Sequence, residues 1–292
     1  MVIRSRRRQL TTGERVVSMR SPTFKLWMLL PVVAAAFFLP AAQAQNTFRV
    51  YGGVAPTSYS IEFDNKAPLG FTNKTAKADY LAANVGFSWI LPQRIYFDVS
   101  VQRSGSATHD LWKDATGGNP SGPNQDFSHD SEVLTAGYIY VLPQGQTISG
   151  FGGLRRGKTT LAAPLGGTVP AGVLTWSKDF FESKGVFFGA AWGMPALGGA
   201  INVSGALALL RGTWSNDSAT NPYNNTADAT LGFSFNAGYT YRFGRGWGVT
   251  GDYRFQRYNY AFNQYTTGAT TNPGYDVTEK ISSIGVRVSY EF

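Results

Sequence analysis

The side chains best suited to acid–base chemistry in this sequence are its two histidines, His109 and His129. Each is followed by an aspartate, Asp110 or Asp130. A histidine beside a carboxylate can act as a general base, so either position could serve a hydrolase. Ser128 precedes His129, but neighbouring strand residues point to opposite faces, which disfavours a serine–histidine pair. We expect two solvated histidines and no enzymatic activity, with a hydrolase that uses His109 or His129 as the alternative.

Other chemistry is weakly represented. The sequence has no cysteine, which excludes disulfides and thiolate metal sites. The histidines lack a spacing that specifies a metal, and the glycines of residues 150–153 do not match a phosphate-binding loop, so no metal or cofactor is expected. Of the formal charge of +8, +6 lies in residues 1–44. The remaining +2 is too little for a nucleic-acid-binding surface.

The elements that would position these residues are strands. Residues 231–243 alternate Leu, Phe, Ala and Tyr on one face with Gly, Ser, Asn, Thr and Arg on the other. Successive strand side chains point to opposite faces, so this segment predicts a strand with one apolar and one polar face.

An internal repeat organises these strands. Five glycines, each followed by alternating aromatic or apolar residues, are spaced by 51, 52, 49 and 47 residues: Gly86, Gly137, Gly189, Gly238 and Gly285. Tight turns follow the first four, at 91–94, 143–146, 195–199 and 244–246, and long polar stretches separate one turn from the next. Short turns at one end and long loops at the other are typical of an outer-membrane barrel.

The last residues carry a second indication. Val286, Val288, Tyr290 and Phe292 alternate with polar residues after Gly285. This pattern resembles the C-terminal assembly signal of bacterial outer-membrane proteins, which implies the β-barrel assembly machinery as a partner during insertion.

With the repeat and this signal, the chain resembles the broad family of small Gram-negative outer-membrane barrels that includes the OmpA- and OmpX-like barrels. We predict an all-β fold, a closed antiparallel up-and-down transmembrane barrel of about ten strands, with both termini periplasmic. Outer-membrane lipids and lipopolysaccharide are the contacts this location implies, and the oligomeric state is left open. The strands are predicted at 47–60, 77–90, 95–110, 131–142, 147–161, 182–193, 200–214, 229–243, 247–262 and 279–292.

The N-terminal region predicts export. Residues 26–40 form an apolar run of 15 residues, whereas a spanning helix needs about 20. Arg20 and Lys25 precede the run, and Ala42-Gln43-Ala44 follows it as a small-x-small cleavage site. We predict a signal peptide in residues 1–44, cleaved after Ala44, and a barrel domain in 45–292. Met1 and Met19 are both possible starts, and an uncleaved anchor is the alternative.

Six charged residues fall on the predicted inward face. An interior of ten strands is narrow. The charges either pair and block it or line a narrow pore with a weak anion preference. These residues are Arg49, Asp98, Arg242, Asp252, Arg254 and Arg287.

The resemblance implies a structural or porin-like protein. A surface adhesion protein acting through its loops and a rim hydrolase of the omptin or lipid-deacylase type are the alternatives. Residues 161–170 are apolar for an outer loop, so they either fold into the barrel mouth or form a hydrophobic contact site.

Overall fold

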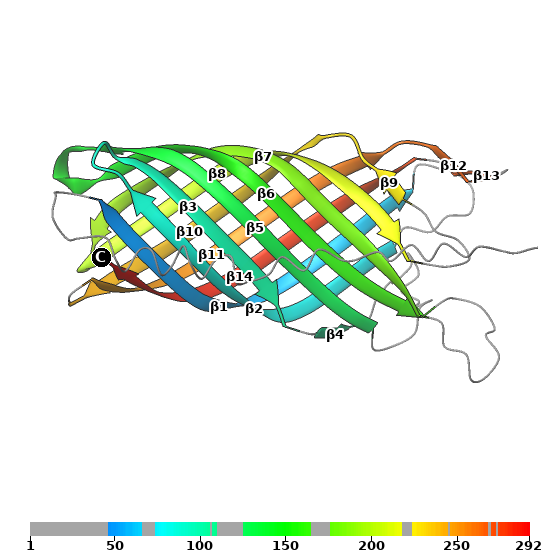
Figure 1. Cartoon of the computed structure of the whole chain (residues 1–292), viewed down its shortest axis with the longest axis horizontal. Helices are drawn as coiled ribbons and strands as arrows, with labels where there is room; N and C mark the ends of the chain where they lie inside the picture. The colour runs from blue at the N-terminus through cyan, green and yellow to red at the C-terminus, as the bar shows by residue number, and fades with distance from the viewer. Residues whose placement is uncertain are drawn as a thin grey trace, which may run out of the picture. The chain divides into compact units, whose positions relative to one another are not determined.

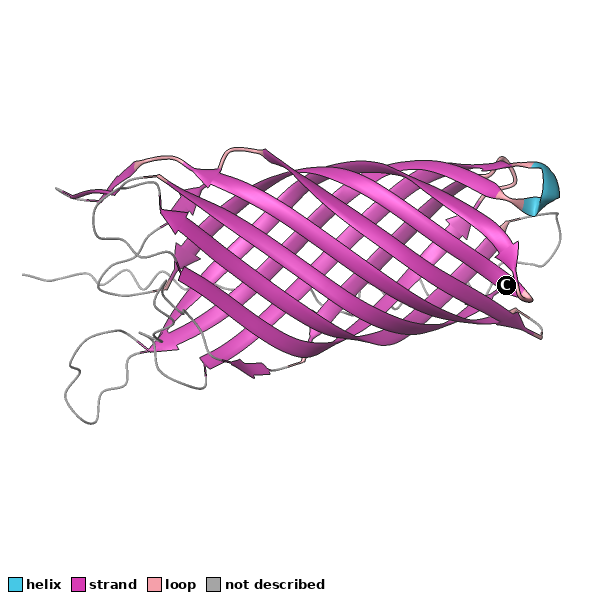
Figure 2. Ribbon diagram, turned by 180° about the vertical axis from the view of Figure 1, so that it is seen from behind, coloured by secondary structure: helices cyan, strands magenta, loops and turns pink. Residues whose placement is uncertain are grey.

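The computed structural model describes residues 46–65, 74–105, 107–109, 125–164, 176–217, 224–244, 246–267, 270–272 and 274–292. Within these ranges nearly every residue belongs to a strand, as Figure 2 shows. No helix in this part of the chain is long and apolar enough to cross a membrane. The predicted signal peptide and its cleavage site lie outside the described residues.

Ten long strands form the wall of the barrel. They are β1 (Thr47–Asn65), β2 (Lys74–Ile90), β3 (Ile95–Ser104), β5 (Gln125–Val141), β6 (Thr147–Pro164), β7 (Trp176–Ala196), β8 (Gly199–Asn216), β10 (Thr230–Phe243), β11 (Trp247–Phe262) and β14 (Tyr275–Glu291). The shorter elements are β4 (Ala107–His109), β9 (Asn224–Thr226), β12 (Tyr265–Thr267), β13 (Thr270–Asn272) and the 3-10 turn η2 (Pro143–Gly145).

The sheet closes on itself. Each long strand pairs antiparallel with its neighbours in the chain, and β1 also pairs with β14, with Gly53 opposite Arg287 and Val54 opposite Val286. Figure 1 shows the first and last strands side by side in the wall. Because the circle is complete, no long strand leaves an unpaired edge, and the predicted closed barrel is confirmed.

The two ends of the barrel differ. Four short connections lie at one end, which we call the turn end; the other is the loop end. The turns need left-handed backbone: Gln144 and Gly145 have φ of 65° and 76°, and Leu197 and Gly198 have 50° and 76°. The last residue also lies at the turn end, where the Phe292 amide donates to the Phe48 carbonyl at 2.9 Å.

The predicted strands are confirmed, but several extend further at the loop end. β5 begins at 125 rather than 131, β7 at 176 rather than 182, and β14 at 275 rather than 279. The predicted strand 95–110 is interrupted after Ser104, and β4 resumes its pairing with β5. Leu161 belongs to β6 and is fully buried in the lumen, and residues 165–175 lie outside the described ranges.

The extra length has a physical reason. Toward the loop end of the strands, the lumen-facing residues become apolar and the outward-facing residues become polar. In β11 the inward face carries Asp252 and Arg254 near the turn end, but buried Tyr258, Tyr260 and Phe262 near the loop end. The outward face changes in the opposite sense, from exposed Tyr253 to Arg257. Because the outward-facing residues at the loop end of the strands are polar, the sequence of these strand ends resembles the start of a loop.

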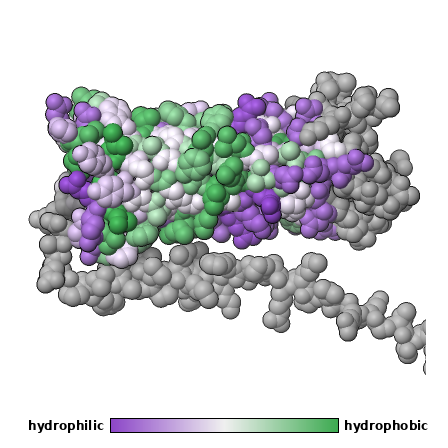
Figure 3. Space-filling view, turned by 90° about the horizontal axis from the view of Figure 1, so that it is seen from above, coloured by the Kyte–Doolittle hydropathy of each residue, from purple (hydrophilic) through white to green (hydrophobic). Residues whose placement is uncertain are grey.

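Register locates the change on the outer surface. Leu134, Leu154, Val186, Leu209 and Leu231 are successive cross-strand partners, all about half exposed. Two residues closer to the loop end, a second row is charged: Glu132, Arg156, Lys184 and Arg211. Figure 3 shows the hydrophobic band on the turn-end side and hydrophilic residues gathered toward the loop end. We take the band as membrane-spanning and the charged row as its boundary.

This boundary predicts position-dependent stability. Val85, 58% exposed, lies on the outward face of β2 between the apolar Leu81 and Trp89, so Val85→Arg should lower the free energy of unfolding in lipid vesicles by about 2–4 kcal/mol. Asp79→Arg, on the same face of β2 and two residues closer to the loop end than Leu81, is the matched control and should change that free energy by less than about 1 kcal/mol. Equal losses in reversible denaturant titrations would contradict the assignment of the band.

Candidate functional site

The lumen is filled at the loop end. Side chains from opposite walls meet there: the rings of Phe63 on β1 and Trp214 on β8 are 4.7 Å apart, and those of Phe181 on β7 and Tyr260 on β11 are 5.0 Å apart. We call the buried members of this cluster the lumen core; all are at most 7% exposed. They include Tyr59, Ile61, Tyr80, Phe127, Leu161, Phe181, Leu210, Trp214, Tyr258, Tyr260, Phe262, Val277 and Ile281.

Several polar side chains are enclosed in this core. His129 Nδ1 lies 2.9 Å from Thr159 Oγ1, which in turn donates to Tyr59 Oη across the lumen at 3.1 Å. The Tyr260 hydroxyl donates to Glu279 Oε2 at 3.1 Å.

The expectation of two solvated histidines is therefore wrong for His129, which is 1% exposed. Its strand position faces the lumen core rather than the rim, so the imidazole is enclosed among buried side chains and bonded to Thr159. The side chain of His109 lies outside the described residues. Within those residues, no cluster of three or more His, Asp or Glu side chains could hold a metal.

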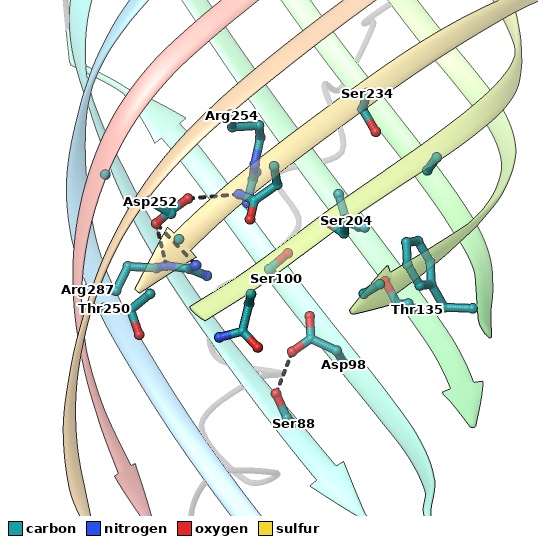
Figure 4. Close-up of a pocket in the computed structure, with 18 of the residues that line it drawn as sticks. Ser88, Asp98, Ser100, Thr135, Ser204, Ser234, Thr250, Asp252, Arg254 and Arg287 are labelled. Carbon is teal, nitrogen blue, oxygen red and sulfur yellow. Dashed lines mark hydrogen bonds and ion pairs between the residues drawn. The ribbon is translucent and has the colours of Figure 1, made fainter. Parts of the chain in front are cut away.

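Toward the turn end, the lumen opens into a cavity of about 540 Å³ that is lined by charged, hydroxyl and apolar side chains. Arg155 and Tyr258 line it where it meets the lumen core, and Thr147 and Ser289 line it near the strand ends. The Arg155 guanidinium stacks over the Tyr258 ring at 4.4 Å. Figure 4 shows charged and hydroxyl side chains from opposite walls pointing into this space.

One ion pair in the cavity depends on glycine. Arg287 donates from Nε to Asp252 Oδ1 at 3.2 Å, and Asn236 donates to Asp252 Oδ2 at 3.1 Å. The cross-strand partners of Asp252 are Gly238 and Gly285. A Cβ atom at either glycine would lie about 3 Å from Asp252 atoms. The absence of a side chain at these two positions therefore provides the space that the Asp252 side chain occupies.

The second carboxylate is held by hydroxyls. Asp98 accepts hydrogen bonds from the Tyr51 hydroxyl at 3.0 Å and from Ser88. Arg49 donates to the Ser88 hydroxyl at 3.3 Å, so it reaches Asp98 only through the serine.

The structure brings five of the six predicted inward charges to the cavity wall: Arg49, Asp98, Asp252, Arg254 and Arg287. Arg242 lies instead at the turn-end rim, where its side chain is 67% exposed and pairs with Glu291 at 3.1 Å. Sequence reasoning missed the buried Arg155 and Glu279. The alternation of the strands could have placed both on the inward face, because Arg155 lies on the same face of its strand as the buried Leu161, and Glu279 on the same face as the buried Ile281.

Comparison with known proteins gives similarity in structure alone. No family model and no curated protein sequence matches the chain. The outer-membrane protease OmpT of Escherichia coli aligns over 87% of this chain and all of its own, with 9% identity and a TM-score of 0.63. The chain has the fold of a Gram-negative outer-membrane β-barrel.

The likeness of this outer-membrane barrel to OmpT shows the fold alone, because site residues cannot be transferred at 9% identity. The translocator domain of the autotransporter NalP from Neisseria meningitidis aligns over 91% of this chain and 95% of its own, at 13% identity. Its TM-score of 0.44 is too low to support an argument.

The Asp252 pair yields a stability prediction. Asp252→Ala should lower the free energy of unfolding by about 1–3 kcal/mol, because it leaves Arg287 and Asn236 without their acceptor in the lumen. Arg287→Ala added to it should recover part of that loss. Asp79→Ala, which removes an exposed carboxylate outside the band, is the control for denaturant titration. A loss no greater than that of the control would refute the role of the pair.

Proposed function

We propose that this chain is a non-enzymatic integral outer-membrane protein with a closed lumen. In this proposal it serves as a structural scaffold that holds an ordered extension above the membrane surface. The observation that carries it is the contact of aromatic rings from opposite walls, Phe63 with Trp214 and Phe181 with Tyr260, across the loop-end lumen.

The orientation is inferred from the two ends. In outer-membrane barrels, short turns face the periplasm and longer loops face outward. We therefore assign the turn end, which includes Phe292, to the periplasm and the loop end to the cell surface. The filled half of the lumen then lies on the outer side, and the cavity faces the periplasm.

A closed lumen disfavours passive transport. A solute that entered the cavity from the periplasm would meet the lumen core, whose Tyr59, Phe181 and Phe262 are at most 2% exposed. Passage would require separation of packed rings, each of which buries a large apolar area. Eight strands already leave an interior that side chains can fill, and ten strands add little to it.

The outer surface favours a lipid partner of defined chemistry. Three cations on adjacent strands, Arg156, Lys184 and Arg211, are consecutive cross-strand partners. They lie two residues closer to the loop end than the apolar row of the band. Glu182 lies 3.2 Å from Arg156 and 4.0 Å from Lys184, and Arg211 has no ion pair among the described residues. Phosphates of an outer-leaflet glycolipid such as lipopolysaccharide, with acyl chains on the band below, would match this arrangement.

The closed lumen is tested by planar-bilayer recording of the mature barrel. The wild type should give no discrete conductance. The double substitution Phe181→Ala and Tyr260→Ala should produce channel openings, because it removes two rings that meet across the lumen. Phe188→Ala, on the lipid-facing side of the same strand, should remain silent. Discrete conductance in the wild type would refute the proposal.

The lipid contact is tested separately by heat denaturation. Lipopolysaccharide should raise the midpoint of unfolding of the detergent-solubilised wild type, and Lys184→Gln with Arg211→Gln should remove most of that rise. Arg94→Gln, an exposed cation at the turn end, should keep it. If the double variant and the control respond alike, the cationic row is not the contact.

A further inference from the structure

One cation in the cavity lacks a partner. Arg254 lies on β11 and lines the cavity, as Figure 4 shows. Arg287 bonds Asp252 and Arg49 bonds Ser88, but the structure gives the Arg254 side chain no hydrogen bond or ion pair among the described residues. A guanidinium presents five N–H donors, so this is a large unsatisfied capacity in a confined space.

The carboxylates nearby are already engaged. Both oxygens of Asp252 accept hydrogen bonds, one from Arg287 and one from Asn236. Asp98 accepts from Tyr51 and Ser88. Four arginines therefore share the cavity wall with two aspartates. Arg155 is stacked on Tyr258, so the positive charge without a partner among the described residues lies at Arg254.

The rest of the wall offers further donors. Ser100, Ser204, Ser234 and Thr250 point into the cavity from different strands, and each hydroxyl can donate to or accept from a ligand. The volume of about 540 Å³ falls within the range of about 300–1,000 Å³ typical of small-molecule sites. The cavity wall includes Thr147 and Ser289 near the strand ends, so the cavity extends to the turn end.

We propose that this cavity binds a small solute bearing an oxyanion, a carboxylate or a phosphate, whose charged group docks at Arg254. Guanidinium groups bind such oxyanions through paired, charge-assisted hydrogen bonds. Hydroxyls of the opposite wall complete the coordination, and the solute enters from the turn end. This site goes beyond the proposed structural function and depends on the cavity rather than on the lumen core.

The test uses the full mature barrel in nanodiscs of zwitterionic phosphatidylcholine, which keeps anionic lipid headgroups out of the experiment. Inorganic phosphate and citrate are the probes, titrated at constant ionic strength against chloride by isothermal calorimetry. The wild type should bind at least one probe saturably. Arg254→Gln should weaken that binding by about tenfold or more, because it removes the charge and the fork of donors. Arg257→Gln, three residues along β11 on the outer face, should bind as the wild type does.

Each outcome is decisive. Absence of saturable binding of both probes by the wild type would overturn the proposal, whatever the variants do, and would leave a cavity filled by solvent. Binding unchanged in a folded Arg254→Gln would also overturn it; fold is checked by heat-modifiable electrophoretic mobility. Binding together with channel conductance would support this site while refuting the closed lumen, so the two proposals fail separately.

Discussion

The structure depends on one requirement, that every backbone N–H and C=O in the apolar band finds its partner within the sheet. Hydrocarbon supplies none, so the sheet has to close, and the pairing of β1 with β14 closes it. Closure fixes much else. Because β1 and β14 pair antiparallel, the number of wall strands is even, and the start of β1 and Phe292 lie at the same end. A closed wall of ten strands also sets a lumen narrow enough for side chains of opposite walls to meet.

Given a closed wall, the surrounding medium decides which face carries which residues. Along the turn-end half the outside is apolar, as at Val85 and Ile284, and the lumen is polar. Along the loop-end half the outside is charged, as at Arg156 and Lys184, and the inside packs like the core of a soluble protein. Each strand thus alternates polar and apolar residues along its whole length, but the apolar residues move from the outward face to the inward face. The row from Glu132 to Arg211 marks this change on the outer surface.

This exchange explains what the sequence could and could not predict. The glycine repeat and tight turns placed the turn-end boundaries to within a few residues, because turn chemistry is local. The loop-end extensions of β5, β7 and β14 were missed since their polar residues face outward and resemble loop. His129 was misplaced for a different reason: its burial depends on Tyr59 and Thr159, which are distant in sequence. Arg242 shares the parity of lumen residues but lies past the cavity, a matter of barrel height that alternation does not encode.

The two halves of the lumen also bear on each other. The loop-end half shows that this chain can fill its interior, with rings in contact and side chains such as Phe262 fully buried. The turn-end half, of the same ten strands, keeps about 540 Å³ open and places four arginines around it. Cations without partners in a confined space are costly, and apolar replacements of similar size are often neutral or stabilising. An inability of this chain to fill its lumen therefore does not explain the open half. The unpaired charge at Arg254 instead agrees with the proposal that the cavity binds an oxyanion.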